Sequence, residues 1–406
     1  MPERTFVVVG ANLTGGRAVE GLRKEGFDGR IVLIGEEPDR PYFRPPLSKD
    51  VLRGESSADS VFVHPEEWYA DHDVELMLGV RAEALDPDGS LELSNGESLG
   101  FDRCLLATGG RPRVLDVPGK DLDGIYYLRT LRDAADLSGR LEQRPNVLVV
   151  GAGFIGAEVA ASAREVGCEV TVIEIFEVPL QRVLGEDLGA VYAQIHRDHG
   201  VDLHLGEVVE SFEGSDRVEE VKSSSGKSYP ADIVVVGVGI APNVELADEA
   251  GIECSDGIEV DEHCRTSAPN VFAAGDVARH PDHYSGKRIR VEHFQNAQNQ
   301  GMAAGRSMAG SEKPFVEVPW FWSDQYDVNL QMLGHPSPDA FRVIRGRLED
   351  RDFTAIYTYG NQITAAIALN RGRDVSALRR LMERRIAVDP KTLADEDISL
   401  KDLLKA

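Results

Sequence analysis

The sequence alternates short apolar runs with longer segments of mixed polarity, a pattern typical of buried strands joined by helices. Val147–Val150 is a Val-rich apolar run, which predicts a buried parallel strand. Helix-forming residues follow from Phe154 to Val166, and a second apolar run covers Val170–Ile173. The N-terminal region repeats this order with Phe6–Val9, a helix to about Lys24 and Ile31–Ile34. The pattern therefore predicts two βαβ units in one chain.

The second unit carries a complete glycine fingerprint between its strand and its helix. Gly151, Gly153 and Gly156 have the G-x-G-x-x-G spacing, and the next strand ends on Glu174. Gly151 permits a tight turn, Gly153 lets the backbone approach a pyrophosphate, and Gly156 brings helix and sheet together. The helix N-terminus offers N–H groups to the phosphates, and Glu174 can accept hydrogen bonds from an adenosine ribose. These residues predict a dinucleotide site; the alternative is an ordinary glycine-rich turn.

The first unit carries an altered copy of this fingerprint. Gly10, Asn12 and Gly15 occupy the three positions, and Glu36 follows the next strand as Glu174 does in the second copy. Asn is among the non-glycine residues that best tolerate a positive φ. Its side chain would nevertheless crowd a phosphate. This copy alone is therefore ambiguous, and its likeness to the second copy makes it a predicted nucleotide site.

The repeat continues after each βαβ unit. In the first copy, a hairpin with an Asn95-Gly96 turn precedes the strand Cys104–Ala107. In the second copy, Val218–Ser223 and a turn at Gly226 precede the strand Ile233–Val236. The segments that connect the copies are predicted to be Gly110–Leu128 and Ile240–Asn243.

After the second copy, the sequence predicts a short strand at 271–276 and a helix, rich in small residues, at Glu292–Ala309. From Pro319 an aromatic cluster, Trp320-Phe321-Trp322, precedes alternating strands and two helical segments, which predict an α+β domain. The strands are Val328–Met332, Phe341–Arg345, Phe353–Thr358 and Gln362–Leu369, and the helical segments are Val375–Arg385 and Leu400–Lys405.

Composition narrows the possible functions. The chain carries 44 Lys and Arg against 69 Asp and Glu, a net charge of −25, which argues against nucleic acid and anionic membranes as partners. No apolar run approaches the ~18 residues of a membrane helix, and the N-terminus lacks a signal-peptide pattern. The four cysteines lack C-x-x-C spacing, so we expect neither a metal site nor disulfides. A cytoplasmic protein is expected.

Several longer motifs, in a fixed order, resemble one family. They are Arg44-Pro45-Pro46-Leu47-Ser48-Lys49, Ala107-Thr108-Gly109-Gly110-Arg111-Pro112-Arg113, Ala274-Gly275-Asp276-Val277, Glu292-His293-Phe294-Gln295-Asn296-Ala297 and Val318-Pro319-Trp320-Phe321-Trp322-Ser323-Asp324-Gln325. Together they resemble the FAD-dependent NADH:ferredoxin or rubredoxin reductases that feed electrons to bacterial oxygenases, which include the putidaredoxin reductases. The resemblance covers essentially the whole chain.

The resemblance implies an α/β fold with two Rossmann-like nucleotide-binding domains of glutathione-reductase type and a C-terminal α+β domain. The FAD domain would comprise residues 1–111 and 242–318, the NADH domain 112–241, and the C-terminal domain 319–406. The implied reaction is hydride transfer from NADH to FAD, followed by single-electron transfers to a ferredoxin or rubredoxin-type carrier.

The resemblance also implies an FAD site. Gly10, Ala11, Asn12 and Gly15 would cradle the pyrophosphate, Glu36 would bind the adenosine ribose, and Lys49 would lie beside the isoalloxazine ring. Phe294 stands where many relatives carry Trp. The further implied FAD contacts are Arg44, Val80, Thr108, Gly109, Arg129, Gly275, Asp276, Phe294 and Trp320.

For NADH the implied contacts lie in the second copy. They are Gly151, Gly153, Ile155, Gly156, Glu158, Glu174, Arg182 and Gly237. Catalytic roles are implied for Lys49 and Glu158, with Lys49 the natural partner of Glu158; the alternatives are a solvated lysine and an exposed helix carboxylate. Glu174 predicts a preference for NADH over NADPH, which Arg182 would partly offset.

The electron acceptor has two candidate contact regions. Arg371–Arg385 carries six arginines against Asp374 and Glu383 in a strongly acidic chain, and Trp320 and Trp322 could form an apolar edge. The alternatives are a solvated helix face and domain-core packing. Relatives that reduce disulfides, persulfides or peroxide carry a cysteine near Phe43-Arg44, whereas this chain has none before Cys104. Two other functions stay open: an NADH oxidase or diaphorase without a dedicated protein acceptor, and a slow-turnover interaction module of the apoptosis-inducing-factor type.

Overall fold

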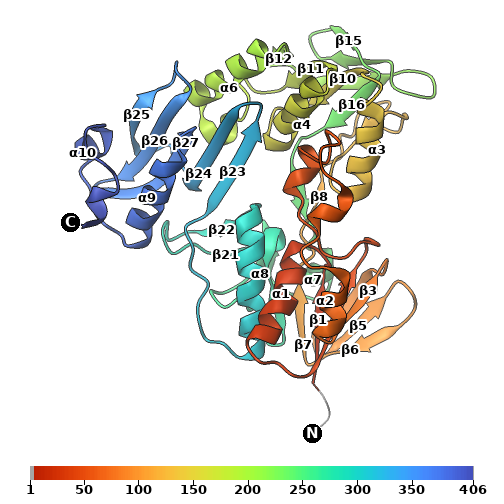
Figure 1. The fold of residues 1–406 in the computed structure, drawn as a ribbon. Helices are drawn as coiled ribbons and strands as arrows, with labels where there is room; N and C mark the ends of the chain where they lie inside the picture. Colours follow the sequence, from red (N-terminus) through yellow and green to blue (C-terminus); the bar gives the residue numbers. More distant parts are fainter. Residues whose placement is uncertain (1–3, 406) are drawn as a thin grey trace. The chain divides into compact units, whose positions relative to one another are not determined.

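The chain folds into two compact units, each made of separate stretches of sequence (Figure 1). The structure is a computed structural model that describes residues 4–405. The first unit comprises Met1–Phe43, Asp59–Arg111 and Ala241–Pro319, and the second comprises Arg44–Ala58, Pro112–Ile240 and Trp320–Ala406. Arg44–Ala58 thus belongs to the second unit, whereas the predicted FAD domain includes it. The three predicted domain boundaries stay a prediction.

The first unit is built on a five-stranded parallel sheet. Its strand order is β20-β7-β1-β2-β3, so the two strands of the βαβ unit lie side by side and β7 returns beside β1. The apolar runs of β20, β7, β1 and β2 are buried on both faces, as is typical of parallel sheets, whereas the edge strand β3 is only partly buried. The strands are β1 (Thr5–Val9), β2 (Arg30–Gly35), β3 (Val74–Leu78), β7 (Arg103–Leu106) and β20 (Val271–Ala273).

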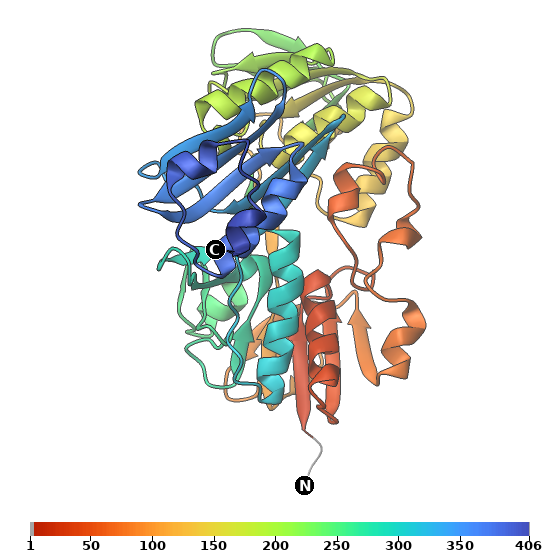
Figure 2. The same cartoon turned by 60° about the vertical axis from the view of Figure 1, so that its left-hand side comes forward.

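Helices α1 (Leu13–Lys24) and α8 (Phe294–Ala309) pack side by side against this sheet (Figure 1, Figure 2). A Cβ added to Gly301 would lie 2.4 Å from the Thr14 carbonyl oxygen, and one added to Gly305 would lie 2.1 Å from that of Ala18. The small residues of α8 therefore allow the close helix packing that the sequence predicted.

Smaller elements complete the first unit. The hairpin predicted around Asn95-Gly96 is present as β5 and β6, next to β4. A four-stranded sheet has the order β18-β19-β21-β22. The bounds are β4 (Ala82–Asp86), β5 (Ser90–Leu93), β6 (Ser98–Gly100), β18 (Cys254–Ser255), β19 (Gly257–Glu259), β21 (Ala278–Pro281), β22 (Arg288–Arg290), α2 (Glu66–Asp71), α7 (Glu245–Glu249), and the 3-10 turns η2 (Ala58–Val61) and η3 (Gly275–Val277).

The second unit repeats the same parallel sheet, with strand order β12-β11-β10-β16-β9. Its three-stranded sheet, β13-β14-β15, corresponds to the sheet β4-β5-β6 of the first unit. This correspondence confirms the predicted internal repeat. The bounds are β9 (Ile125–Tyr126), β10 (Asn146–Val150), β11 (Glu169–Glu174), β12 (Asp202–Leu205), β13 (Val209–Glu213), β14 (Glu220–Ser223), β15 (Ser228–Pro230), β16 (Ile233–Val236), α3 (Leu131–Leu141), α4 (Phe154–Glu165), α5 (Gln181–Leu184), α6 (Glu186–Asp198) and η1 (Pro45–Ser48). Two connecting strands, β8 (Gly110–Pro112) and β17 (Ile240–Pro242), pair with each other.

The C-terminal part of the second unit is an antiparallel sheet with strand order β23-β24-β27-β26-β25. The aromatic cluster Trp320-Phe321-Trp322, which was predicted to precede the strands of this domain, is the start of strand β23. Its apolar residues are consecutive and conceal the alternation of a strand. The bounds are β23 (Trp320–Gln325), β24 (Val328–Gly334), β25 (Phe341–Arg347), β26 (Asp352–Tyr359), β27 (Gln362–Leu369), α9 (Gly372–Glu383), α10 (Pro390–Ala394) and η4 (Asp402–Lys405). The predicted fold class is confirmed.

Candidate functional site

The first nucleotide turn joins β1 to α1. Gly10 has φ 119°, and a Cβ there would lie 2.2 Å from the Ala107 carbonyl oxygen. A Cβ on Gly15 would lie 2.0 Å from the Gly10 carbonyl oxygen. Both glycines are therefore required by backbone conformation and close packing, as the fingerprint predicts.

Asn12 does not use the positive φ that Asn tolerates. Its φ is −113°, and it is the N-cap residue of α1. Its Oδ1 accepts hydrogen bonds from the N–H groups of Thr14 (2.9 Å) and Gly15 (3.3 Å), and its Nδ2 donates to Ala107 O at 2.6 Å. An N-cap residue has an extended backbone, so Asn is present here for its side-chain oxygen.

Replacing Asn12 with Ala is expected to lower the free energy of unfolding by about 1 kcal/mol more than replacing it with Ser. Ser keeps a capping oxygen, and both variants lose the bond to Ala107, so their difference reports the cap alone. Equilibrium urea unfolding of the purified protein followed by circular dichroism measures it. Equal losses in the two variants would show that Asn12 does not stabilise α1 as a cap.

A buried polar cluster lies next to the first turn and fits an anionic cofactor. Gln300 on α8 is 0% exposed, its Oε1 accepts from Gly275 N at 2.8 Å, and its Nε2 has no hydrogen-bond partner among the described residues. A Cβ on Gly275 would lie 2.3 Å from Thr14 Oγ1, so this segment closely approaches the start of α1. A buried donor without a partner is costly in a native protein. A bound phosphate-containing group would satisfy it.

Thr108 and Gly109 are held by a residue that the sequence analysis did not select. The Thr108 hydroxyl donates to Asn243 O at 2.7 Å, and Asn243 Nδ2 donates to Thr108 O at 2.9 Å. The Asn243 N–H donates to Gly109 O at 2.9 Å. The position of Asn243 in the returning connection, directly after Pro242, was the available signal.

The other FAD contacts predicted in the first unit are spread over several elements. Glu36 is exposed directly after β2, and Ala11 is buried in the turn after β1. The Val80 N–H donates to Gly35 O at 2.9 Å. Asp276 lies in η3, and Phe294 begins α8 with its ring edge-on to Phe43, at 5.5 Å between centroids. Their FAD contacts stay predictions.

The second nucleotide turn differs from the first in its cap. Gly153 is the N-cap residue of α4 and provides no side-chain hydrogen bond, whereas Asn12 caps α1. A Cβ on Gly151 would lie 2.6 Å from Gly237 O, which places Gly237 against this turn. Ile155 is 47% exposed at the start of α4. The first turn of α4 therefore offers N–H groups and an apolar side chain to a ligand.

Glu174 supports this second turn. Its Oε2 accepts from Ala152 N at 2.5 Å and its Oε1 from Phe176 N at 2.9 Å, and the residue is 6% exposed. Each carboxylate oxygen can accept more than one hydrogen bond, so the predicted ribose contact is compatible with these bonds. Arg182 is exposed and its guanidinium lies 4.8 Å from the centre of the Phe176 ring.

Glu158 and Lys49 form a buried ion pair inside the second unit. Glu158 on α4 is 3% exposed, and its Oε2 lies 2.6 Å from Lys49 Nζ. The Ser48 hydroxyl donates to the same oxygen at 2.5 Å, and the Ser323 hydroxyl donates to Oε1 at 2.6 Å. The predicted pairing is confirmed, and the alternative of an exposed carboxylate is excluded. Neither serine was selected from the sequence.

A short proline-led turn positions Lys49 and Ser48. Pro45 and Pro46 begin η1, where their fixed φ angles suit the first helical positions. The Ser162 hydroxyl on α4 donates to Ser48 O at 2.7 Å, which fixes the turn beside Glu158. The preceding Arg44 donates from Nη1 to the Arg129 carbonyl oxygen, so these two predicted FAD contacts lie together.

Trp320 and Trp322 lie on the face of β23 opposite to Ser323. Their rings stack at 5.1 Å between centroids, and Trp320 Nε1 donates to Gln331 Oε1 at 3.2 Å. Both side chains are half-buried. They therefore combine the packing role and the partly exposed edge that the sequence analysis kept as alternatives.

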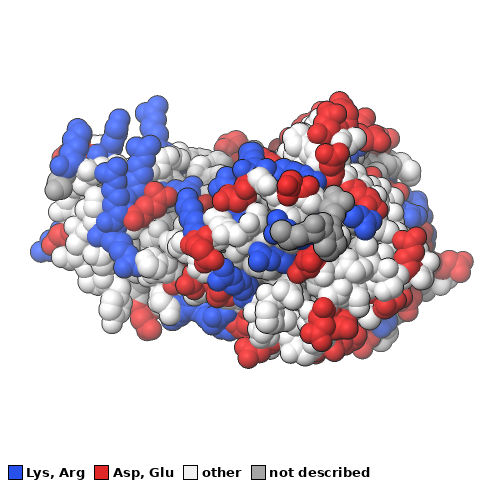
Figure 3. All heavy atoms as spheres, turned by 90° about the horizontal axis from the view of Figure 1, so that it is seen from below, with Lys and Arg blue, Asp and Glu red and all other residues white. Residues whose placement is uncertain are grey.

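The arginines of 371–385 separate into two groups. Arg371 is bound to Asp352 and Glu396, and Arg379 pairs with Glu383 at 3.0 Å. Exposed arginines are Arg373, Arg380, Arg384 and Arg385. Figure 3 shows Lys and Arg side chains gathered over the C-terminal elements at the left of the view. Only part of the predicted charge is therefore available to a partner.

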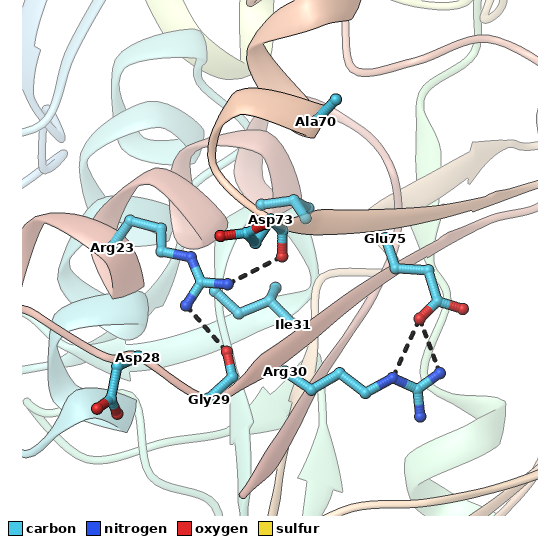
Figure 4. A pocket seen from close by; sticks show the side chains of 9 residues that line it. Arg23, Asp28, Gly29, Arg30, Ile31, Ala70, Asp73 and Glu75 are labelled. Carbon is cyan, nitrogen blue, oxygen red and sulfur yellow. Dashed lines mark hydrogen bonds and ion pairs between the residues drawn. The ribbon is translucent and has the colours of Figure 1, made fainter. Parts of the chain in front are cut away.

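A surface hollow of about 410 Å³ in the first unit is lined by residues that stabilise the fold (Figure 4). Arg23 on α1 donates there to the carbonyl oxygens of Phe27, Gly29, His72 and Asp73. Arg30 pairs with Glu75 at 2.7 Å. The hollow includes Arg30 and Val74, at the amino ends of β2 and β3, whereas α/β sheets bind nucleotides at the carboxyl ends.

The cysteines give no sign of redox or metal chemistry. Cys104 and Cys264 are buried, and burial raises the pKa of both thiols. Within residues 4–405 no group of three or more His, Cys, Asp or Glu could hold a metal ion. None of the described helices is long and apolar enough to cross a membrane.

Comparison with known proteins covers both parts of the chain. Residues 4–301 match the family described as pyridine nucleotide-disulphide oxidoreductase, and residues 320–404 match the family described as reductase C-terminal. Rhodocoxin reductase of Rhodococcus erythropolis is 36% identical over 98% of this chain and 93% of its own. The anthranilate 1,2-dioxygenase system ferredoxin–NAD(+) reductase component of Burkholderia cepacia is 39% identical over 98% of this chain and 99% of its own.

A solved structure gives the same result. The covalent putidaredoxin reductase–putidaredoxin complex matches with a TM-score of 0.96 at 35% identity, over 99% of this chain and 98% of that one. The resemblance predicted from the motifs is confirmed. The chain therefore belongs to the pyridine nucleotide-disulphide oxidoreductase family, and its relatives are of the putidaredoxin-reductase type.

Proposed function

We propose that this chain is an FAD-dependent NADH:ferredoxin oxidoreductase that supplies electrons to an oxygenase system. The observation that carries this proposal is the presence of two βαβ nucleotide turns in one chain, with different caps. The turn at Gly153 has no side-chain cap and suits the exchangeable NADH. The turn at Asn12 lies beside the buried donor of Gln300 and suits the resident FAD.

FAD, when bound, would supply the coupling between the two-electron oxidation of NADH and two one-electron reductions of the acceptor protein. The chain's own residues would bind and orient the two cofactors. Gly10, Gly15, Gly275 and Gln300 would hold the FAD phosphates, and Glu174 fixes the turn that would receive the NADH phosphates. Lys49 provides a partly buried positive charge, and Glu158 with its two serine donors holds the ammonium in place.

Anaerobic stopped-flow mixing with NADH, followed by reduction of candidate ferredoxins, tests this function. Fast bleaching of the flavin and fast ferredoxin reduction are expected. Fast bleaching without reduction of any iron–sulfur protein would instead indicate a diaphorase or an NADH oxidase. Slow bleaching would indicate a module whose cofactor alters association.

The exposed arginines on α9 and at its C-terminal end are proposed to contact the ferredoxin. Reversing the charge of Arg380 and Arg384 to Glu is expected to raise KM for an acidic ferredoxin about tenfold at low salt, with a smaller effect at high salt. Ferricyanide reduction with NADH should not change. Arg347→Glu is the matched control, because Arg347 is also highly exposed in the C-terminal sheet but lies on β25. An equal effect of all the reversals would show that net charge matters rather than α9.

A further inference from the structure

A continuous series of hydrogen bonds leads away from Glu158 through the second unit. Ser323 and Gln325 lie two residues apart on β23, so both side chains point to the face that meets α4 and α6. They are 0% and 1% exposed. Gln325 Nε2 lies 3.2 Å from Ser323 Oγ, and Gln325 Oε1 lies 3.1 Å from His196 Nε2 on α6. His196 Nδ1 lies 3.1 Å from the Tyr326 hydroxyl oxygen.

The charge of Glu158 fixes the direction of the first bonds. A carboxylate only accepts hydrogen bonds, so the single proton of the Ser323 hydroxyl must point to Glu158 Oε1. Ser323 Oγ can then only accept from its other neighbour, which must be the NH₂ group of Gln325. The amide oxygen of Gln325 therefore faces His196.

The two neighbours of His196 determine its tautomer. Its Nε2 faces the Gln325 oxygen and must carry a proton. Burial lowers the pKa of His196 to about 4, so the ring is neutral near pH 7 and its Nδ1 carries no proton. Nδ1 therefore accepts from the Tyr326 hydroxyl. Every donor in the series thus points toward Glu158.

Tyr326 marks the outer end of this series. Its φ is 55°, a left-handed backbone conformation that a tyrosine rarely adopts. Its ring stacks on His199 at 3.7 Å between centroids, and its hydroxyl is bonded to His196. The turn between β23 and β24 is therefore held in an unfavourable conformation by contacts with α6.

We propose that Ser323, Gln325 and His196 are positioning residues that orient the Glu158 carboxylate, so that its other oxygen holds Lys49 in the place needed for flavin reduction. With Oε1 bound to Ser323, Oε2 is left to Ser48 and Lys49. The inference rests on the proposed function for the role of Lys49. The hydrogen-bond directions rest on the contacts alone.

Nitrogen-15 NMR of the histidine-labelled holoprotein tests the directions independently of turnover. The His196 signal is assigned by its loss in His196→Gln, and wild type is expected to show the Nε2–H tautomer. In Gln325→Leu the ring loses its acceptor at Nε2, so the proton should move to Nδ1 and be donated to the Tyr326 oxygen. In Tyr326→Phe the Nε2–H tautomer should remain. An Nδ1–H tautomer in wild type would overturn the directions.

Stopped-flow reduction by NADH tests the positioning role. Ser323→Ala is expected to lower the limiting rate of flavin reduction about tenfold, the size of one hydrogen bond to a charged group, with little change in the apparent Kd for NADH. Thr358→Val is the matched control: Thr358 is 0% exposed in the same sheet, and its hydroxyl lies 3.3 Å from the Phe341 oxygen.

The two tests separate the possible failures. An unchanged limiting rate in both Ser323→Ala and Gln325→Leu overturns the positioning role even where the tautomers are as expected. Equal rate losses in Ser323→Ala and Thr358→Val also overturn it, because a general packing defect would then be the cause. If wild type itself is not reduced by NADH, the proposed function fails, and the NMR result still decides the hydrogen-bond directions.

Discussion

Replacing Glu174 with Ala is expected to lower the preference for NADH over NADPH by as much as about a thousandfold in kcat/KM. A carboxylate ~4 Å from a 2′-phosphate would repel it by up to ~4 kcal/mol at an effective dielectric constant of ~20. The charge is well fixed, because both oxygens of Glu174 accept backbone hydrogen bonds and the residue is 6% exposed. Steady-state reduction of ferricyanide with each cofactor measures the ratio.

The ratio, rather than either rate, is the informative quantity. Glu174 also supports the turn through Ala152, so its removal should lower kcat/KM with both cofactors. Arg182→Ala should move the ratio in the opposite direction, because a cation near the phosphate favours NADPH. Equal NADH/NADPH ratios in Glu174→Ala and in the parent protein would remove Glu174 from cofactor selection.

The sequence was most informative where structure depends on local order. The repeated strand, turn and helix and the glycine positions are properties of short segments, and the two repeated sheets confirm the predicted order of strands. Asn12 shows the limit of this information. Asn suits both a left-handed turn and an N-cap, and only the backbone angle of −113° distinguishes the two.

Residues that depend on packing between distant segments were missed. Ser323 reaches Glu158 across 165 positions of sequence, and His196 reaches Gln325 across 129. No local pattern distinguishes such polar residues from exposed ones. Charge counting had the same weakness: Arg371 was counted as free, but Glu396 and Asp352 neutralise it.

Replacing Lys49 with Met is expected to lower the free energy of unfolding by about 3–5 kcal/mol. Met has a similar length without the charge, so Glu158 would become a buried carboxylate without a cation, and breaking one side of a buried pair is costly for that reason. The double variant Lys49→Met/Glu158→Gln should recover much of this loss, because the amide carries no charge. Urea unfolding of the parent protein, the single variants Lys49→Met and Glu158→Gln, and the double variant gives the coupling energy.

Activity and stability should separate in the double variant. Its flavin reduction by NADH should stay slow although its stability recovers, since the ammonium that favours the reduced, anionic flavin is absent in both variants. Lys49→Arg retains a cation and is the control for charge. A double variant with the parent rate and flavin potential would mean that the ion pair only stabilises the fold, because a cation that tunes the flavin cannot be replaced by neutral packing.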